Sequence, residues 1–277
     1  MPRWVRIITM LAIALSFGCN STPTPTFYEQ TPSVPLLPEA SDELLAPARE
    51  VLEALEALEA PNLTFPEAQS RKAAVKVMRP LENGHGSGTY MLMHGRYVVV
   101  TAAHVVGDAT TMFVEGRDEE RVVGISVYTD EASDLAVLVI PRLESRSAIP
   151  FRPKKRATNL VGAKVNYTGF PSHHDLLTIR GDVASLERGM IVVNMFGWFG
   201  SSGSGVYDIH GRLVGVVSGI DVGYWMVPLP LHSVVWVAPT WEFDFEMLEV
   251  RVKTAPDLGK INSFPGARAP RRGTSRD

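Results

Sequence analysis

Gly200-Ser201-Ser202-Gly203-Ser204-Gly205 is the stretch that decides how this chain of 277 residues is interpreted. A Gly-x-Ser-Gly turn presents a serine hydroxyl and can aim backbone N–H groups at the point where a negatively charged oxygen would form. Ser202 fits the turn best, because Gly200 lies two residues before it and Gly203 follows directly. The N–H groups of Gly200 and Ser202 are the predicted oxyanion hole. The alternative is an ordinary Gly/Ser hairpin turn, which this composition also suits.

Two segments upstream of the turn carry the other residues that such chemistry needs. Thr101-Ala102-Ala103-His104 and Asp134 precede Ser202 in the order His, Asp, Ser. A serine hydroxyl becomes a good nucleophile when a base takes its proton, and a third group must hold that base in the right tautomer. We therefore predict that His104, Asp134 and Ser202 act together. Taken singly, His104 could be a core histidine, and Asp134 a turn residue that competes with Asp130.

The rest of the chain between Arg71 and Thr240 consists of short β-branched and aromatic runs separated by turn residues. This spacing is typical of antiparallel barrels or sandwiches. The linker around Pro150–Ala157 divides the runs into two series. The predicted strands are Ala73–Met78, Gly88–Met93, Tyr97–Thr101, Arg121–Tyr128 and Leu135–Ile140 in the first series, and Lys164–Gly169, Gly181–Leu186, Met190–Asn194, Gly205–Asp208, Arg212–Ser218 and Tyr224–Val227 in the second.

Together these residues resemble the trypsin-like, chymotrypsin-fold serine peptidases, above all the bacterial high-temperature-requirement proteases and glutamyl endopeptidases. The resemblance covers Arg71 to Thr240 and includes the segments Val165–Pro171 and Gly211–Ser218. It implies an all-β fold of two six-stranded antiparallel barrels with the active site between them. It also implies a serine endopeptidase whose ligand is an extended peptide or unfolded protein, paired with the backbone near Ser218.

The resemblance also indicates which residues wall the primary specificity pocket. These substrate-binding residues are Phe196, Gly197, Ser218, Gly219 and Ile220. No acidic residue stands at the base of the pocket, which disfavours Arg or Lys before the scissile bond. Val217 stands where glutamyl enzymes usually have a histidine. We expect a small or medium apolar side chain before the scissile bond.

Composition argues against several other functions. A net charge of −3 and a pI near 6.2 provide no basic surface for nucleic acid. The single cysteine, Cys19, excludes an intrachain disulfide and a cysteine-based metal cage. His173-His174-Asp175 could suggest a metal, yet adjacent histidines on a strand point to opposite faces, which favours a solvated loop. Gly84–Gly88 lacks the Gly-Lys-Ser/Thr of a phosphate loop. We expect no cofactor and no metal.

The N-terminal residues have the order of an export signal. Arg3 and Arg6 precede the apolar run Ile7–Phe17, which is too short for a comfortable transmembrane span. Leu15–Cys19 resembles a degenerate lipoprotein box and favours lipidation of Cys19, which would tether the protein to a membrane. The alternative is a plain export signal with an incidental cysteine. The expected location is the periplasm or cell envelope, or the medium if the protein is secreted.

Two segments flank the peptidase-like region, which we assign to residues 71–240. After the signal (1–19), residues 20–70 contain a Pro-rich tether and a short amphipathic helix over Ser41–Ala60, capped by Ser41. That helix could dock on the domain or self-associate. Residues 241–277 form a C-terminal arm and a disordered basic tail, and the partial alternation in Trp241–Val252 predicts one more strand or an extended arm.

Two other functions remain open on the sequence. One is a catalytically silent peptide-binding protein on the same scaffold, because a glycine-rich turn can flip a peptide and lose its oxyanion hole. The other is a processing protease of a phage or virus, which would use the same site. The oligomeric state and the physiological substrate also stay open.

Overall fold

The computed structural model describes residues 62–80, 84–156, 159–172, 174–224 and 227–258. The predicted signal with Cys19, the tether, and the helix predicted over Ser41–Ala60 lie outside these residues, as does most of the predicted tail. Within the described ranges, no helix has the length and apolar character needed to cross a membrane.

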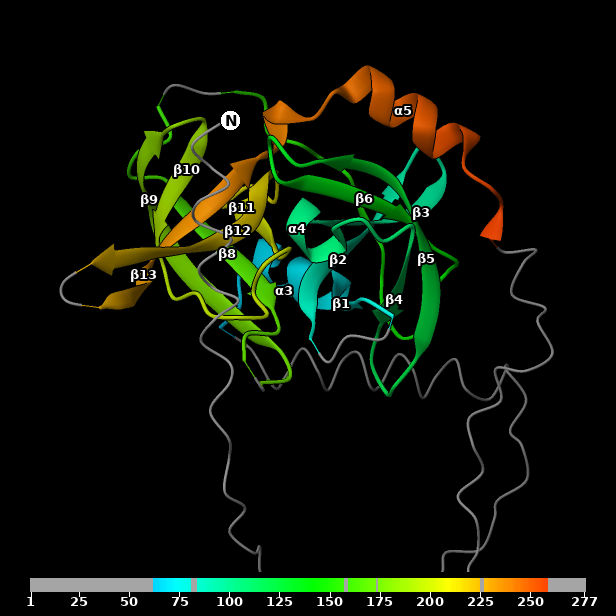
Figure 1. Ribbon diagram of the computed structural model, residues 1–277, viewed down its shortest axis with the longest axis horizontal. Coiled ribbons are helices and arrows are strands. Elements are labelled where there is room, and N and C mark those ends of the chain that lie inside the picture. Colours follow the sequence, from blue (N-terminus) through cyan, green and yellow to red (C-terminus); the bar gives the residue numbers. More distant parts are fainter. Residues whose placement is uncertain (1–61, 81–83, 157–158, 173, 225–226, 259–277) are drawn as a thin grey trace, which may run out of the picture. The chain divides into compact units, whose positions relative to one another are not determined.

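The first barrel is built from the β-branched runs of the first series (Figure 1). Its strand order is β1-β4-β5-β6-β3-β2, and β1 also pairs with β2, which closes the ring. Strand β4 and the two-residue β7, parallel to β2, were not predicted. The strands are β1 (Ala74–Met78), β2 (Gly86–Met93), β3 (Arg96–Thr101), β4 (Thr111–Glu115), β5 (Arg121–Asp130), β6 (Leu135–Val139) and β7 (Ile149–Pro150).

The second series forms a closed six-stranded barrel with the order β10-β13-β12-β11-β8-β9. Two six-stranded antiparallel barrels were predicted, and the prediction is confirmed. The strand predicted at Tyr224–Val227 is wrong, because Tyr224 ends β12 and β13 begins at Pro228. The strands are β8 (Lys164–Gly169), β9 (Leu177–Glu187), β10 (Met190–Asn194), β11 (Gly205–Asp208), β12 (Leu213–Tyr224) and β13 (Pro228–Pro239).

Each barrel has its own core, and a third apolar cluster lies between them. The alternation of β3 shows how this arises, because successive side chains of a strand point to opposite faces. Val99 belongs to the core of the first barrel. Val98 and Val100 belong to the third cluster, where they share buried surroundings with Leu213 and Val216 of β12. The barrels are therefore joined by apolar packing, which holds the loops of both barrels in fixed relation.

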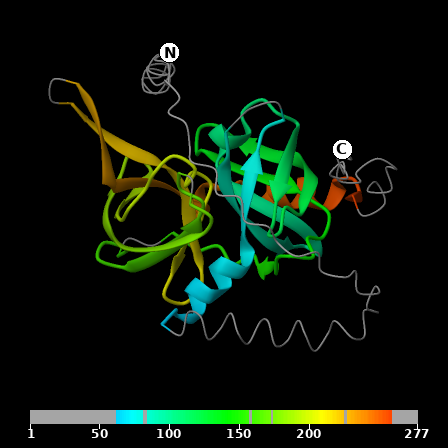
Figure 2. The same cartoon turned by 90° about the horizontal axis from the view of Figure 1, so that it is seen from below.

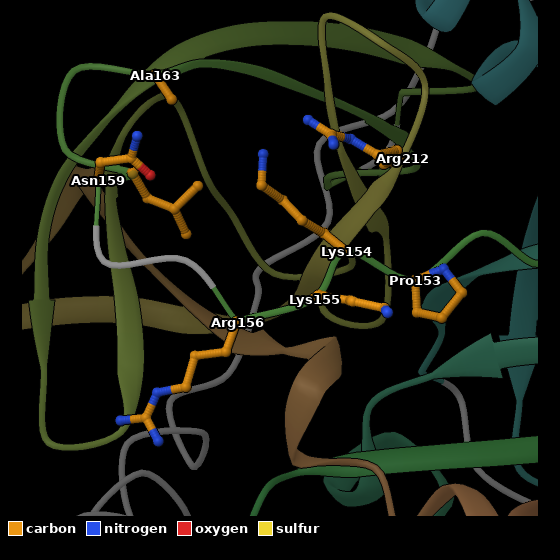
Figure 3. A pocket seen from close by; sticks show the side chains of 8 residues that line it. Pro153, Lys154, Lys155, Arg156, Asn159, Ala163 and Arg212 are labelled. Carbon is orange, nitrogen blue, oxygen red and sulfur yellow. The ribbon is translucent and has the colours of Figure 1, made fainter.

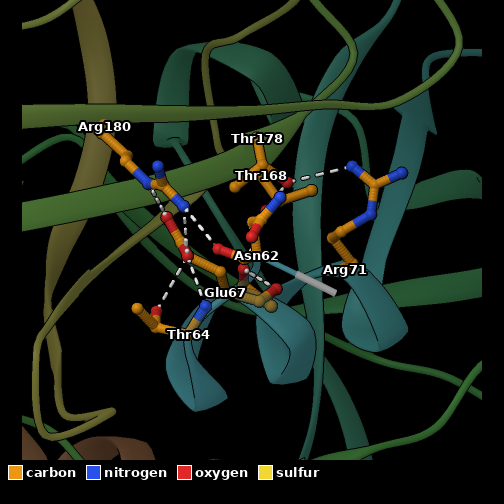
Figure 4. A network of polar contacts seen from close by, with 8 residues as sticks. Asn62, Thr64, Glu67, Arg71, Thr168, Thr178 and Arg180 are labelled. Carbon is orange, nitrogen blue, oxygen red and sulfur yellow. Dashed lines mark hydrogen bonds and ion pairs between the residues drawn. The ribbon is translucent and has the colours of Figure 1, made fainter. Parts of the chain in front are cut away.

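A short helix, α3 (Phe65–Ala73), precedes β1 and was not predicted (Figure 4). Its start is set by Glu67, whose carboxylate accepts from the backbone N–H of Thr64 at 2.6 Å and from the Thr64 hydroxyl at 2.9 Å. Arg180 of β9 also pairs with Glu67. The helix therefore contacts the second barrel, while the strand that follows it enters the first.

The C-terminal described segment is a helix, so the strand or extended arm predicted over Trp241–Val252 is wrong. A 3-10 turn, η1 (Thr240–Glu242), leads into α5 (Phe245–Thr254). Asp244 caps α5 by accepting from the N–H of Met247 at 3.0 Å. Leu248 and Val252, four residues apart, are both buried against the third cluster. In Figure 1, α5 lies over one end of the first barrel. The i, i+4 spacing of its buried residues outweighs the partial alternation.

Candidate active site

His104 lies on the single-turn helix α4 (Ala103–Val106), which directly follows the buried strand β3. The guanidinium of Arg79, which directly follows β1, donates to the carbonyls of Val105 at 3.0 Å and of His104 at 2.5 Å and so anchors this turn. The imidazole keeps 41% of its surface exposed. Arg79 thus fixes the backbone at His104, while the imidazole ring stays accessible to solvent.

Asp134 lies in the turn between β5 and β6, with a φ of 57°. Its carboxylate accepts from the backbone N–H of His104 at 2.9 Å, and Nδ1 of the same histidine lies 2.9 and 3.0 Å from its two oxygens. Because a carboxylate only accepts, Nδ1 must carry the proton, and Nε2 of the neutral ring is left as the base. Asp130 instead accepts from Ala132 and Ser133 within its own turn.

Ser218 of β12 links this pair to the second barrel. Its hydroxyl donates to Oδ2 of Asp134 at 2.5 Å. Its carbonyl oxygen lies 3.3 Å from Oγ of Ser202, which donates to it. Among the residues that the structure describes, no hydrogen bond joins Ser202 to His104. The histidine and the aspartate are therefore paired, and the serine hydroxyl is directed to Ser218.

The three serines of the glycine-rich turn differ in accessibility. Ser201 is 1% exposed and donates its hydroxyl to the carbonyl of Trp198 at 2.5 Å. Ser204 is fully buried beneath the turn. Ser202 is partly exposed. Of the three, Ser202 therefore has the hydroxyl best placed to meet a substrate.

Two peptide groups of the turn, Phe199–Gly200 and Ser201–Ser202, have carbonyls that are fixed by hydrogen bonds. The N–H of Ser172 donates to the carbonyl of Phe199 at 2.6 Å, and the N–H of Ser204 donates to that of Ser201 at 3.0 Å. In a trans peptide the N–H points opposite to the C=O. The N–H groups of Gly200 and Ser202 therefore point away from these contacts, and neither donates to a backbone acceptor in the described part of the chain.

Only glycine fits at positions 200 and 203. Both residues have positive φ, 93° and 91°, which other residues rarely adopt. A Cβ at Gly200 would collide with the carbonyl of Phe170, and one at Gly203 with the carbonyl of Ser87. The turn is thus pressed against backbone from both barrels, so its conformation is defined by packing as well as by sequence.

The residues predicted for the specificity pocket lie along β12 and the loop before the turn. Gly197 is buried, and its N–H donates to the carbonyl of His232 at 2.7 Å. A Cβ at Gly197 would stand 2.9 Å from Cγ2 of Ile220 and 2.7 Å from Cγ2 of Val235. Phe196 is 44% exposed. Gly219 has open space where a side chain would be. The branched side chains of Ile220 and Val235 therefore fill the space beside Gly197.

Sequence reasoning missed Ser87, Ser172 and Val235. Ser87, at the start of β2, donates its hydroxyl to the carbonyl of Gly200 at 2.7 Å and accepts from the N–H of Phe170 at 2.9 Å. The glycine-rich stretch Gly84–Gly88, which resembles the first-barrel hairpin of the family, was the available signal for Ser87. Val235 carried no signal, because an apolar residue in a β-branched run is indistinguishable from core.

A hollow of about 620 Å³ lies apart from these residues, at the linker between the barrels (Figure 3). It is basic, but its cations do not converge: Figure 3 shows Arg156 pointing away from Lys154. Lys154 and Arg212 are both paired with Asp208, at 2.8 and 2.7 Å. Burial alone would raise the pKa of Asp208, but hydrogen bonds from these cations lower it to about 2. The pairing is structural and leaves no built anion site.

Comparisons with known proteins agree with this architecture. Residues 86–216 match the sequence family described as trypsin-like peptidase domain. The structure is similar to a serine endoprotease from Yersinia pestis, with 20% identity and a TM-score of 0.54 over 68% of this chain and 66% of that one, just under two thirds of its length. It is also similar to the inactive form of a serine-to-alanine mutant of Rv3671c from M. tuberculosis H37Rv, with 20% identity and a TM-score of 0.54 over 72% and 95% of the two chains. No curated protein matches the chain.

Proposed function

We propose that this chain, whose residues 86–216 match the trypsin-like peptidase domain family, is a serine endopeptidase that uses Ser202 as nucleophile, His104 as base and Asp134 as the orienting carboxylate. The observation that carries the proposal is the contact of Asp134 with Nδ1 of His104 at 2.9 Å. That contact leaves Nε2 unprotonated and available to a hydroxyl. An ordinary turn aspartate and an ordinary core histidine would have no reason to meet in this way.

The proposed reaction begins when the Ser202 hydroxyl rotates from the carbonyl of Ser218 towards His104. Nε2 takes the proton, and Oγ bonds to the carbonyl carbon of the scissile peptide. The N–H groups of Gly200 and Ser202 donate to the resulting oxyanion. His104 then gives its proton to the departing amine. In the second half of the reaction, His104 takes a proton from water, the water oxygen bonds to the acyl carbon, and Ser202 leaves with the proton that His104 returns. Asp134 stabilises the imidazolium and stays ionised throughout.

The proposed substrate is an extended peptide with a small or medium apolar side chain before the scissile bond. The filling of the space beside Gly197 by Ile220 and Val235 supports this preference, because a long or charged side chain would have no room there. Ser218, Gly219 and Ile220 supply backbone for the substrate to pair with. No acidic side chain faces Gly197 among the contacts described above.

Two substitutions in the same turn test the proposal. Ser202→Ala should abolish casein hydrolysis, whereas Ser204→Ala should retain it, because Ser204 is buried beneath the turn. Equal loss in both variants, with both proteins folded, would move the nucleophile elsewhere. Retained hydrolysis in Ser202→Ala would end the assignment.

One observation favours a second candidate function, a catalytically silent peptide-binding protein. The Ser202 hydroxyl is directed to Ser218 and not to His104 in the described residues. A protein fixed in this state would bind extended peptides through β12 without cutting them. Such a protein would bind a peptide library and leave every member intact.

Export and a membrane tether belong to the same proposal. Arg3, Arg6 and the apolar run that ends before Cys19 support export, and Cys19 is the proposed lipidation site. Metabolic labelling with a fatty acid should mark the wild-type chain and not Cys19→Ser. Equal labelling of both chains would contradict lipidation at Cys19.

A further inference from the structure

Strand β12 continues far beyond the barrel on one side only. It pairs with β11 up to Val216, whereas β13 accompanies it from Gly215 to Tyr224. The backbone of Val217 is bonded to the glycine-rich turn, through Ser204 and Gly203. From Ser218 to Tyr224, therefore, β12 has a neighbour strand on one edge and none of the described strands on the other. In Figures 1 and 2 this β12–β13 arm projects from the second barrel.

The two edges of the arm differ in hydrogen-bonding capacity. Val222 is paired with Pro230 and Tyr224 with Pro228. Proline has no N–H, so a paired strand accommodates it where its nitrogen faces away from the partner. At such non-bonded pairs, the N–H and C=O of the opposite residue also face outward, away from β13. The outer edge of β13 thus lacks donors at both prolines, while β12 directs polar groups from Val222 and Tyr224 to its free edge.

The N–H of Val222 behaves as expected for a group on the free edge. It donates to Oδ1 of the neighbouring Asp221 at 3.0 Å. A carboxylate that covers an edge donor protects the strand against indiscriminate pairing. An incoming peptide carbonyl can replace that oxygen. The arm is therefore protected on one edge by prolines and on the other by a displaceable side chain.

The free edge begins at the proposed catalytic centre. Ser218 is the first residue of the edge. Its carbonyl accepts from the Ser202 hydroxyl, and its own hydroxyl donates to the carboxylate of Asp134. A peptide that pairs antiparallel with β12 and presents its scissile bond to Ser202 must run outward along the arm. The residues before the scissile bond would then lie opposite Ser218, Ile220, Val222 and Tyr224 in turn.

The proposed function already pairs the substrate with the backbone of Ser218, Gly219 and Ile220. We infer that this pairing continues along β12 to Tyr224, so that the segment before the scissile bond, about seven residues long, binds as an added strand. This inference rests on the proposed function. The same arm exposes apolar side chains, since Leu229 is 48% exposed and Leu231 39%. A Cβ added to Gly223 would lie 3.5 Å from the methyl groups of Leu231, so the Leu231 side chain covers this face of the arm. The substrate class is an unfolded protein segment with apolar side chains, free of acidic residues near Asp221.

Binding to the full chain carrying Ser202→Ala tests the inference without cleavage. Two fluorescent peptides share the three residues before the scissile bond and the residues after it, and the longer one has four further apolar residues upstream. The longer peptide should bind at least tenfold more tightly. Equal affinities would overturn the inference. Failure of the wild-type chain to cut either peptide would contradict the proposed function, while the affinity ratio would still test the edge.

A pair of variants tests the edge itself. Val222→Pro removes the outward N–H and adds a ring to the edge, whereas Val222→Ala keeps the N–H. The ratio of kcat/KM for the long and short peptides should fall towards one in Val222→Pro, and Val222→Ala should keep at least half of the gain. A retained ratio in folded Val222→Pro would overturn the inference. If that variant does not fold, the binding comparison above decides.

A second copy of the chain is the competing occupant of this edge. Light scattering separates the two occupants. If the edge joins two copies, Val222→Pro should disrupt the dimer, and the molecular mass of the variant should be half that of the wild type. A halved mass with an unchanged length ratio would overturn the inference. An unchanged mass with a lost ratio supports it.

Discussion

Ser218 on the second barrel donates its hydroxyl to Asp134 on the first barrel at 2.5 Å. Because the same carboxylate accepts from His104, this contact ties the orientation of the proposed base to the packing of the two barrels. The chain thus couples its proposed chemistry to its tertiary structure through one hydroxyl.

Removing that hydroxyl should slow the reaction without preventing it. Ser218→Ala deletes one of the hydrogen bonds to an ionised carboxylate, which is typically worth about 1.5–3 kcal/mol, so kcat/KM should fall roughly tenfold to a hundredfold. Steady-state kinetics checks this. The matched control is Ser126→Ala, which should keep wild-type activity, because the hydroxyl of Ser126 pairs with that of Thr129 on the exposed side of β5. Unchanged activity in Ser218→Ala would contradict the coupling.

Ser87 should act as a positioning residue for the oxyanion hole. Its hydroxyl holds the carbonyl of Gly200, so Ser87→Ala should lower kcat about tenfold with little change in KM. The affinity for a peptide aldehyde, which forms a tetrahedral adduct, should fall in parallel. A loss of thermal stability with unchanged kcat and aldehyde affinity would show that Ser87 is only structural.

Val235 should limit the size of the side chain accepted before the scissile bond. Val235→Ala removes the methyl groups beside Gly197, so the ratio of kcat/KM for leucine over alanine at that position should rise about tenfold. Val237→Ala is the matched control, since it shortens a buried valine of the same strand and core cluster. A similar rise in both variants would mean that core loosening, and not the pocket, sets the preference.

The free energy of unfolding should depend on pH through the carboxyl group of Glu67 (Figure 4). The hydrogen bond from Arg180 is the main cause that lowers the pKa of Glu67 from 4.5 to about 2. The stabilisation is therefore complete above pH 4.5 and is lost as the pH falls towards 2. Glu67→Gln should lower the free energy of unfolding by about 1–3 kcal/mol at pH 7 and by much less at pH 2.5.

Urea titrations at the two pH values measure this difference. Asp182→Asn is the control, because Asp182 pairs with Lys164 on the exposed surface, where ion pairs contribute little. An equal penalty for Glu67→Gln at both pH values would show that the carboxylate charge does not contribute to stability.

The sequence predicted the strands where local pattern and fold agree. Runs such as Val98–Val100 and Leu135–Val139 are β-branched, short and bounded by turn residues, and each became a strand. Strand β13 was missed because its prolines at 228, 230 and 239 usually exclude a strand. Pro228 and Pro230 are tolerated because their nitrogens face the open edge of the arm, and Pro239 because it ends the strand. Helix α3 was missed although Thr64 and Glu67, three residues apart, form a local capping box. Only the pairing of Glu67 with Arg180, which holds the helix against the second barrel, is distant in sequence.

The site divides in the same way. His104, Asp134 and Ser202 could be named from short motifs, and the structure brings His104 and Asp134 into contact. The contact of Ser87 with the carbonyl of Gly200 could not be predicted, because it depends on the packing of the first barrel against a turn of the second. The contact of Ser172 with the carbonyl of Phe199 could not be predicted either, because it joins two loops of the second barrel that are distant in sequence. Motifs identify the reacting groups, whereas the groups that hold them follow only from tertiary structure.

The central claim is that Ser202 is a nucleophile activated by His104. The most direct measurement is the mass of the chain after incubation with a fluorophosphonate probe, followed by peptide mapping. A single adduct should form on the peptide that contains Ser202, and it should disappear in His104→Ala. An unmodified wild-type chain, or an adduct that persists in His104→Ala at the same rate, would contradict the account.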